Sequence, residues 1–144
     1  MSNFVPKFKM YNSSIQLRVR YSETDQMGYV YYGNYAQYFE VARVEALRSL
    51  GITYKAMEEE GVIMPVLEYN IKYFKPAFYD DLLTINVVIP SIPSARIYFE
   101  YDTYNKEGML LNKATTTLVF INKKTGKPTA TPANVLSSMM HFFK

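Results

Sequence analysis

The sequence contains no cysteine, and its single histidine, His141, stands three residues from the end. The lack of cysteine excludes thiol catalysis, disulfide bonds and cysteine metal ligands. One histidine cannot make a histidine-rich metal site, and a serine–histidine–aspartate triad would have to recruit this last-turn residue. Catalysis must therefore use carboxylates, hydroxyls, tyrosines, lysines or backbone groups, and we expect neither a metal nor a cofactor.

Long apolar runs and strong charge are also missing. No stretch approaches the ~20 apolar residues that a membrane span needs. Residues 1–14 are mixed and polar, and they lack the apolar core of a secretory signal. The net charge of +3 is mild and does not point to nucleic acid. We therefore expect a cytoplasmic protein that binds neither a membrane nor nucleic acid.

Apolar and aromatic residues, by contrast, are plentiful. A chain of 144 residues is one domain of ordinary size, and its 49% hydrophobic content can form a full core. Fourteen tyrosines and nine phenylalanines favour a β-rich domain. No repeat, low-complexity segment or linker interrupts the chain, so we expect a single domain over residues 1–144.

The spacing of apolar residues predicts one long helix and five strands. Alternation over residues 15–21 predicts a half-buried strand, and helical periodicity covers residues 34–50. Asn34 is the expected N-cap, with Gln37 completing a capping box and Gly51 ending the helix. The other expected elements are helices at 53–60 and 132–143 and strands at 64–75, 82–89, 95–104 and 109–121. These four strands can pair as an antiparallel meander around the long helix, which gives an α+β domain.

The stretch before and within the long helix carries the most chemical information. It reads RYSETDQMGYVYYGNYAQYFEVARVEALRSLG from Arg20 to Gly51. Acyl transfer needs a carboxylate or other base close to N–H donors that stabilise an oxyanion. Asp25 stands shortly before a helix start, where free N–H groups are available. The structural alternative is an aspartate that satisfies local N–H groups in a turn.

This stretch resembles the hotdog-fold acyl-CoA thioesterases of the 4-hydroxybenzoyl-CoA thioesterase-like family. The matching residues are Thr24, Asp25, Gly28, Val30, Tyr31, Tyr32, Asn34, Tyr35, Phe39, Glu40, Ala42 and Arg43. The resemblance implies a hotdog fold, in which one long central helix is wrapped by an antiparallel sheet of five or more strands. It also implies a homodimer or homotetramer with active sites at subunit boundaries.

The resemblance assigns the catalytic carboxylate to Asp25, either as the nucleophile or as the general base that activates water. It places the donors that polarise the thioester carbonyl in the backbone around Tyr32 and Gly33, helped by the helix dipole. The structural alternative is a tyrosine packed on the sheet beside a flexible turn residue. Related branches often carry histidine where Tyr32 stands, so a histidine-assisted mechanism is not expected here.

The implied function is hydrolysis of an acyl-CoA thioester to a free acid and CoA. Glu40 is then an acid that lines the substrate pocket, its alternative being a solvated glutamate near Arg43. Arg96 is a candidate for binding the CoA phosphates, its alternative being an ordinary solvated side chain. Three other functions remain open: a thioesterase for acyl-carrier protein, a hotdog dehydratase or hydratase, and a non-catalytic module that binds acyl thioesters.

Overall fold

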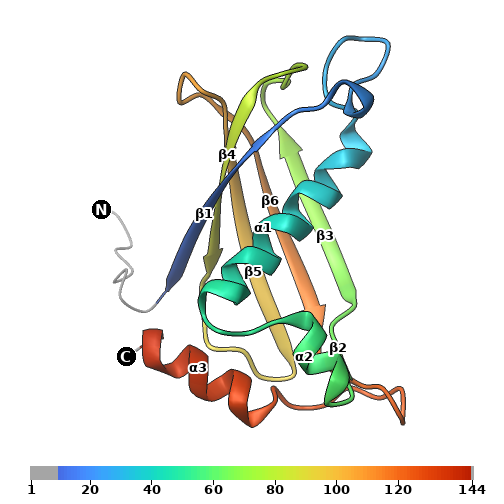
Figure 1. The fold of residues 1–144 in the computed structure, drawn as a ribbon, viewed down its shortest axis with the longest axis vertical. Coiled ribbons are helices and arrows are strands. Elements are labelled where there is room, and N and C mark those ends of the chain that lie inside the picture. Colours follow the sequence, from blue (N-terminus) through green and yellow to red (C-terminus); the bar gives the residue numbers. More distant parts are fainter. Residues whose placement is uncertain (1–9, 144) are drawn as a thin grey trace.

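The computed structural model describes residues 10–143, and in it a five-stranded antiparallel sheet curls around one long helix (Figure 1). The expected α+β architecture is confirmed. The sheet contains β1 (Tyr11–Arg18), β3 (Val66–Tyr73), β4 (Leu82–Ile89), β5 (Arg96–Tyr104) and β6 (Leu110–Val119). The helices are α1 (Tyr35–Ser49), α2 (Tyr54–Glu59) and α3 (Ala133–Phe143), and a small second sheet pairs β2 (Val62–Ile63) with β7 (Ile121–Asn122).

The order of strands in the main sheet is β1-β4-β5-β6-β3. Strands β4, β5 and β6 form the expected meander, but β3 pairs with β6 and not with β4, the next strand along the chain. The connection from residue 74 to residue 81 therefore crosses one end of the sheet. There it contacts the chain before α1, because Val30 N–H donates to the Ala77 carbonyl at 2.9 Å and Val19 N–H donates to the Asp81 carbonyl at 2.9 Å.

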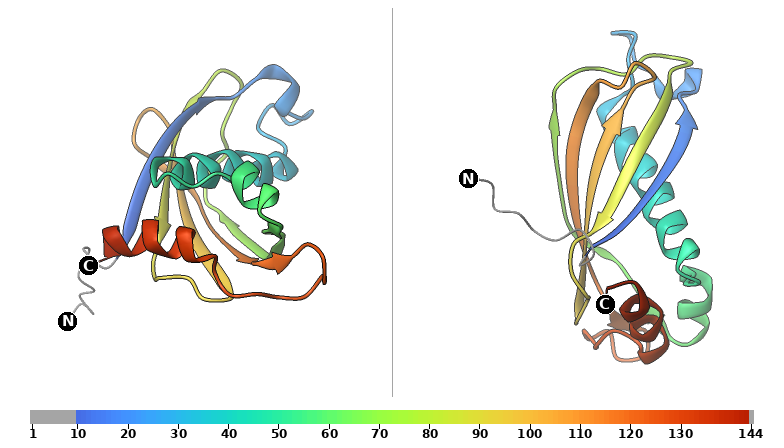
Figure 2. Two further views of the ribbon diagram at one scale, coloured as in Figure 1. Left: turned by 60° about the horizontal axis from the view of Figure 1, so that its bottom comes forward. Right: turned by 90° about the vertical axis from the view of Figure 1, so that its left-hand side faces the viewer.

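Aromatic packing between α1 and the sheet explains the position of β3. Helix α1 lies within the curl of the sheet (Figure 2), where Phe39 is fully buried with its ring 4.6 Å from the ring of Tyr101. Burying a side chain of this size contributes about 1.5–3 kcal/mol. At the sheet edge, the rings of Tyr35 and Tyr73 lie 5.8 Å apart. Pairing with β6 thus lets β3 cover the flank of α1.

The helix begins differently from the expectation. Asn34 has helical backbone angles (φ −74°, ψ −19°), and its side chain does not cap α1. Its Nδ2 instead donates to the Glu23 carbonyl at 2.8 Å. The predicted capping box of Asn34 and Gln37 was therefore wrong, because an acceptor outside the helix binds the Asn34 side chain. A 3-10 turn over Tyr32–Asn34 continues the helix upstream.

The first strand also ends earlier than expected, and a second 3-10 turn follows at Tyr21–Glu23. The Glu23 carboxylate closes this turn by accepting from the Arg20 N–H at 2.8 Å, and it also accepts from the Tyr38 hydroxyl at 2.8 Å. Burial acts to raise the pKa of Glu23, but the hydrogen bonds from Arg20 and Tyr38 and the Arg20 charge outweigh it and hold the pKa below 4.5.

We predict that Glu23→Gln lowers the free energy of unfolding near neutral pH by about 1–2 kcal/mol, because a buried, charge-assisted hydrogen bond is lost. A carboxyl whose folded pKa is depressed stabilises the fold above its unfolded pKa of 4.5, and this contribution is lost as the pH falls through the folded pKa. The difference between parent and variant should therefore shrink below that pH in urea unfolding. Glu45→Gln, which removes only an exposed pair with Arg48, is the control. A difference that stays constant with pH contradicts the prediction.

Candidate active site

Asp25 lies in a tight turn in front of the helix. Gly28 N–H donates to the Asp25 carbonyl at 3.0 Å, and Gly28 has φ +89°, a left-handed conformation that suits glycine. One carboxylate oxygen, Oδ1, accepts from Met27 N–H at 2.9 Å. The Oδ2 atom has no hydrogen bond to any described residue, and the side chain is half-buried. The carboxylate therefore stabilises its own turn and still keeps one oxygen for chemistry.

Tyr32 and Gly33 form the 3-10 turn that leads into α1. Their N–H groups come before the first hydrogen bonds of the helix, and neither finds an acceptor in residues 10–143. Gly33 allows a close approach of the Tyr31 ring, since a Cβ built on it would lie 2.7 Å from that ring and would displace it. The turn thus offers two backbone donors at the positive end of the helix dipole.

Backbone hydrogen bonds join the carboxylate turn to the donor turn. The Glu23 carbonyl accepts from Tyr31 N–H at 2.9 Å and from the Asn34 side chain at 2.8 Å. Asp25 N–H donates to the Tyr29 carbonyl at 3.0 Å, which closes the carboxylate turn just before Tyr31. The Tyr32 hydroxyl and, to a smaller extent, the negative charge of Asp25 raise the pKa of Tyr31. Hydrogen bonds therefore link the carboxylate turn to the donor turn, while Asp25 lines a hollow of its own turn and Tyr32 lines a different one beside β3.

Two open grooves follow each other along α1 on the side of β3. The first has a volume of about 290 Å³ and is lined by Tyr29, Tyr32, Tyr35, Tyr73, Phe74, Lys75 and Pro76. The second has a volume of about 320 Å³ and is lined by Ala36, Gln37, Phe39, Glu40, Arg43, Val66, Tyr69 and Thr116. Burial and the neighbouring tyrosines raise the pKa of Tyr69 to about 12. Phenols in this environment stay protonated at neutral pH and act only through hydrogen bonds and packing.

The two predicted substrate-binding residues lie in different places. Glu40 is exposed and lines the second groove, as a pocket-lining acid should. Arg96 begins β5, whereas the chain around Asp25 lies at the opposite end of the sheet (Figure 1). A nine-residue strand covers roughly 25–30 Å. Within one chain, Arg96 is therefore far from Asp25.

Two further charged residues line the grooves, Lys75 in the first and Arg43 in the second. Arg43 matches the family motif and was named as a neighbour of Glu40 without being given a role, and the structure buries it. Its signal was present, because Arg43 follows Phe39 by four residues and precedes Ala46 by three, which places it on the apolar face of the helix.

Two further observations concern the described part of the chain. No group of three or more histidine, aspartate or glutamate side chains in residues 10–143 could hold a metal ion. None of the helices there is long and apolar enough to cross a membrane.

Comparison with known proteins finds relatives over most of the chain. Residues 19–139 match the family model described as the thioesterase-like superfamily. YneP of Bacillus subtilis is 38% identical over 119 residues, which cover 83% of this chain and 86% of that protein. The acyl-CoA thioester hydrolase YbgC of Escherichia coli is 33% identical over 121 residues, covering 84% of this chain and 90% of YbgC.

A solved structure shows the same fold. The DHNA-CoA thioesterase from Staphylococcus aureus superposes with a TM-score of 0.80 at 36% sequence identity, covering 83% of this chain and 80% of the other. The hotdog fold expected from the sequence is thereby confirmed. Because the family model spans most of the chain and several relatives exceed 30% identity over most of its length, this chain belongs to the thioesterase-like superfamily.

Proposed function

We propose that this protein is a thioester hydrolase that cleaves acyl-CoA to a free acid and CoA. One observation carries the proposal: the turn of Asp25, whose carboxylate keeps a free oxygen, is joined by backbone hydrogen bonds to the segment that leads into Tyr32 and Gly33, whose N–H groups find no acceptor in residues 10–143. The activity named for YbgC, and the DHNA-CoA thioesterase activity named for the Staphylococcus aureus structure, support the same chemistry.

In the proposed reaction the thioester carbonyl oxygen accepts hydrogen bonds from the Tyr32 and Gly33 N–H groups. These bonds and the helix dipole stabilise the negative charge that develops on this oxygen. Asp25 acts by one of two routes. As a general base it takes a proton from water, the water oxygen bonds to the acyl carbon, the C–S bond breaks, and the proton passes to the thiolate. As a nucleophile it bonds to the acyl carbon and expels the thiolate, and water then hydrolyses the acyl anhydride.

We further propose that two copies pair through β3. This strand ends the sheet, and its unpaired edge exposes large apolar side chains, with Leu67 54% and Tyr73 46% exposed. Such an edge is normally covered. An isologous antiparallel pairing would bring opposite ends of the two sheets together, so that Arg96 of one copy approaches the Asp25 end of the other. This arrangement supports Arg96 as a phosphate ligand across the boundary. Since acyl-CoA is made and used inside cells, we propose the cytoplasm as the site of action.

We predict that Asp25→Asn lowers kcat for the best substrate in an acyl-CoA panel by roughly a hundredfold or more, the loss expected when a general base is removed. The asparagine keeps an oxygen for Met27 N–H, so the fold should remain. Free thiol release measures the rate, and Asp102→Asn, which removes a carboxylate paired with Lys113 in the sheet, is the control. Full activity of a folded Asp25→Asn protein would falsify the role of Asp25, and no hydrolysis of any acyl-CoA by the parent would favour a binding module.

Three variants separate the backbone donor from the surrounding side chains. Gly33→Pro removes the N–H group and should reduce kcat by roughly a hundredfold to a thousandfold. Gly33→Ala keeps the donor and only displaces the Tyr31 ring, so it should lose much less activity. Tyr32→Phe removes a hydroxyl and should keep most of kcat. Steady-state kinetics that show equal losses in Gly33→Pro and Gly33→Ala would argue against a backbone oxyanion site.

We predict that light scattering at micromolar concentration gives a mass at least twice the 16.7 kDa of one chain. Leu67→Lys places a charge on the exposed β3 edge and should shift the protein toward single chains. Ile92→Lys is the matched control, because Ile92 is 43% exposed on the turn between β4 and β5, away from that edge. A parent protein that is only monomeric, or equal effects of both lysines, would rule out pairing through β3.

A further inference from the structure

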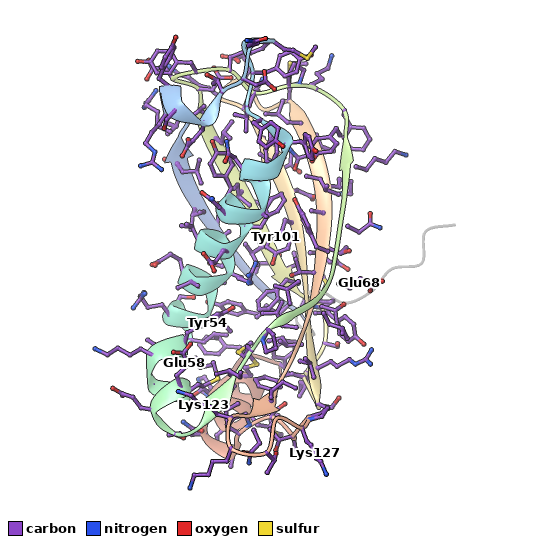
Figure 3. The ribbon with its side chains drawn as sticks, turned by 90° about the vertical axis from the view of Figure 1, so that its right-hand side faces the viewer. Tyr54, Glu58, Glu68, Tyr101, Lys123 and Lys127 are labelled. Carbon is purple, nitrogen blue, oxygen red and sulfur yellow. The ribbon has the colours of Figure 1, made fainter. Side chains whose placement is uncertain are left out.

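A small polar cluster lies inside the apolar core, on the inner face of the sheet. Thr103 of β5 and Asn112 of β6 are both fully buried and stand opposite each other where the two strands pair. Tyr101, two residues before Thr103, shares this face of β5 and points into the space between the sheet and α1 (Figure 3). Opposite residues of an antiparallel pair have Cβ atoms about 4.5–5.5 Å apart. The Thr103 hydroxyl and the Asn112 amide therefore share one region of the core.

Three side-chain atoms of this cluster have no hydrogen-bond partner within residues 10–143, namely Thr103 Oγ1, Asn112 Oδ1 and Asn112 Nδ2. In the described part of the chain, no other buried side-chain nitrogen or oxygen is in this state. Buried polar groups are nearly always hydrogen-bonded, because an unpaired one loses its bonds to water without replacement. Three such atoms side by side indicate that they share a bound partner.

The hydroxyl of Tyr35 approaches the cluster from α1. Tyr35 is buried, and its ring lies 5.8 Å from the ring of Tyr73, the residue of β3 that pairs with Asn112. Burial raises the pKa of Tyr35, whereas the Asn112 amide acts in the opposite direction, which places this amide beside the phenol. The two groups nevertheless do not form a direct hydrogen bond. Polar groups that lie near each other in this way are commonly joined by a water molecule.

We propose that Tyr35, Thr103 and Asn112 bind one internal water molecule, and that this water anchors the start of α1. A buried water needs two to four hydrogen bonds. The two hydroxyls can each donate or accept, the Asn112 carbonyl oxygen accepts, and its Nδ2 donates. The cluster therefore offers enough partners of both kinds.

Tyr35 connects this water to the turn that carries the proposed oxyanion donors. Its backbone N–H donates to the Tyr32 carbonyl and so closes the 3-10 turn of Tyr32 and Gly33. Holding the phenol thus fixes the residue through which this turn enters the helix. Thr103 and Asn112 are then positioning residues, which act on the donors only through Tyr35. The water site depends on the burial of these groups alone, whereas its effect on hydrolysis rests on the proposed function.

The sign of a stability change tests the water site. Thr103→Val and Asn112→Leu replace the polar groups by apolar ones of similar shape. Each should raise the equilibrium constant for unfolding in urea roughly three- to tenfold, because the groups that remain lose a bonded partner. Groups that had no partner at all would instead give stabilised variants, and that result overturns the proposal.

A double-mutant cycle tests whether the phenol and the amide share this water. Asn112→Leu should cost less stability in a Tyr35→Phe background than in the parent, because the first change already weakens the common site. Losses that simply add overturn the shared water. A crystal structure of the parent should show one water oxygen within about 3 Å of polar atoms of Tyr35, Thr103 and Asn112. A direct bond between Asn112 and Tyr35, with no water between them, overturns it as well.

Amide hydrogen exchange tests the anchor without any need for turnover. The Asn34 N–H lies in the donor turn, and the Gly51 N–H lies just beyond the far end of α1, and both donate within the backbone. Asn112→Leu should speed exchange at Asn34 roughly tenfold relative to Gly51, because the start of the helix opens locally more often. If this variant does not fold, Thr103→Val takes its place.

Thr131→Val is the matched control, because it removes another buried hydroxyl, which donates to the Ser94 carbonyl just before β5. It should leave the ratio of the two exchange rates unchanged, and an equal rise in both variants overturns the anchor. In kinetics with acyl-CoA, Asn112→Leu should lower kcat about tenfold with little change in KM, since misplaced donors lose contacts that matter most in the transition state. An unchanged kcat despite faster exchange overturns the positioning role. A parent that hydrolyses no acyl-CoA contradicts the proposed function, while the stability and exchange results still decide the water site.

Discussion

The geometry of the candidate site depends on Glu23, which forms hydrogen bonds through both its side chain and its backbone. Its buried carboxylate is held by Arg20 and by the Tyr38 hydroxyl, so that α1 fixes the residue in place. Its carbonyl holds Tyr31 and Asn34, on either side of the donor turn. The core of the domain therefore positions the loop through a single residue. Such prior organisation is what allows N–H donors to stabilise charge without rearranging during the reaction.

The two grooves are lined mostly by aromatic and apolar side chains and carry few charges. Tyrosines make up much of the first groove. Burial raises the pKa of Tyr35, which lines this groove, and of Tyr69, which lines the second groove. Neutral phenols and aromatic rings provide a surface on which apolar acyl groups pack, while only Glu40, Arg43 and Lys75 bring charge. Discrimination between substrates can then arise at a few charged positions, because an unsatisfied buried polar group costs more than an apolar contact gains.

Local patterns in the sequence predicted the elements well and their pairing less well. The ends of α1 lie within one residue of the expected range, and β4 matches at both ends, since both are set by apolar periodicity. The partner of β3 and the true acceptor for Asn34 are contacts between distant segments, which local patterns do not record. The same limit applies to the site: Asp25, Tyr32 and Gly33 are close in sequence and belong to two turns joined by short-range hydrogen bonds, whereas the surroundings of Arg43 come from α2 and β5 as well as from α1.

The connection that crosses the end of the sheet has a consequence for how the protein folds. Its backbone holds Val19 and Val30, which lie far from it in sequence. The loop between Val30 and Ala77 is long, so closing it is entropically unfavourable until β3 has paired with β6. Contacts between such distant segments form slowly. The hydrogen bond between Val30 and Ala77, which holds the end of the carboxylate turn against the sheet, can therefore form only after β3 has joined β6. A local opening of the crossing segment would release the backbone hydrogen bonds at Val19 and Val30 while the packing of α1 on the sheet remains.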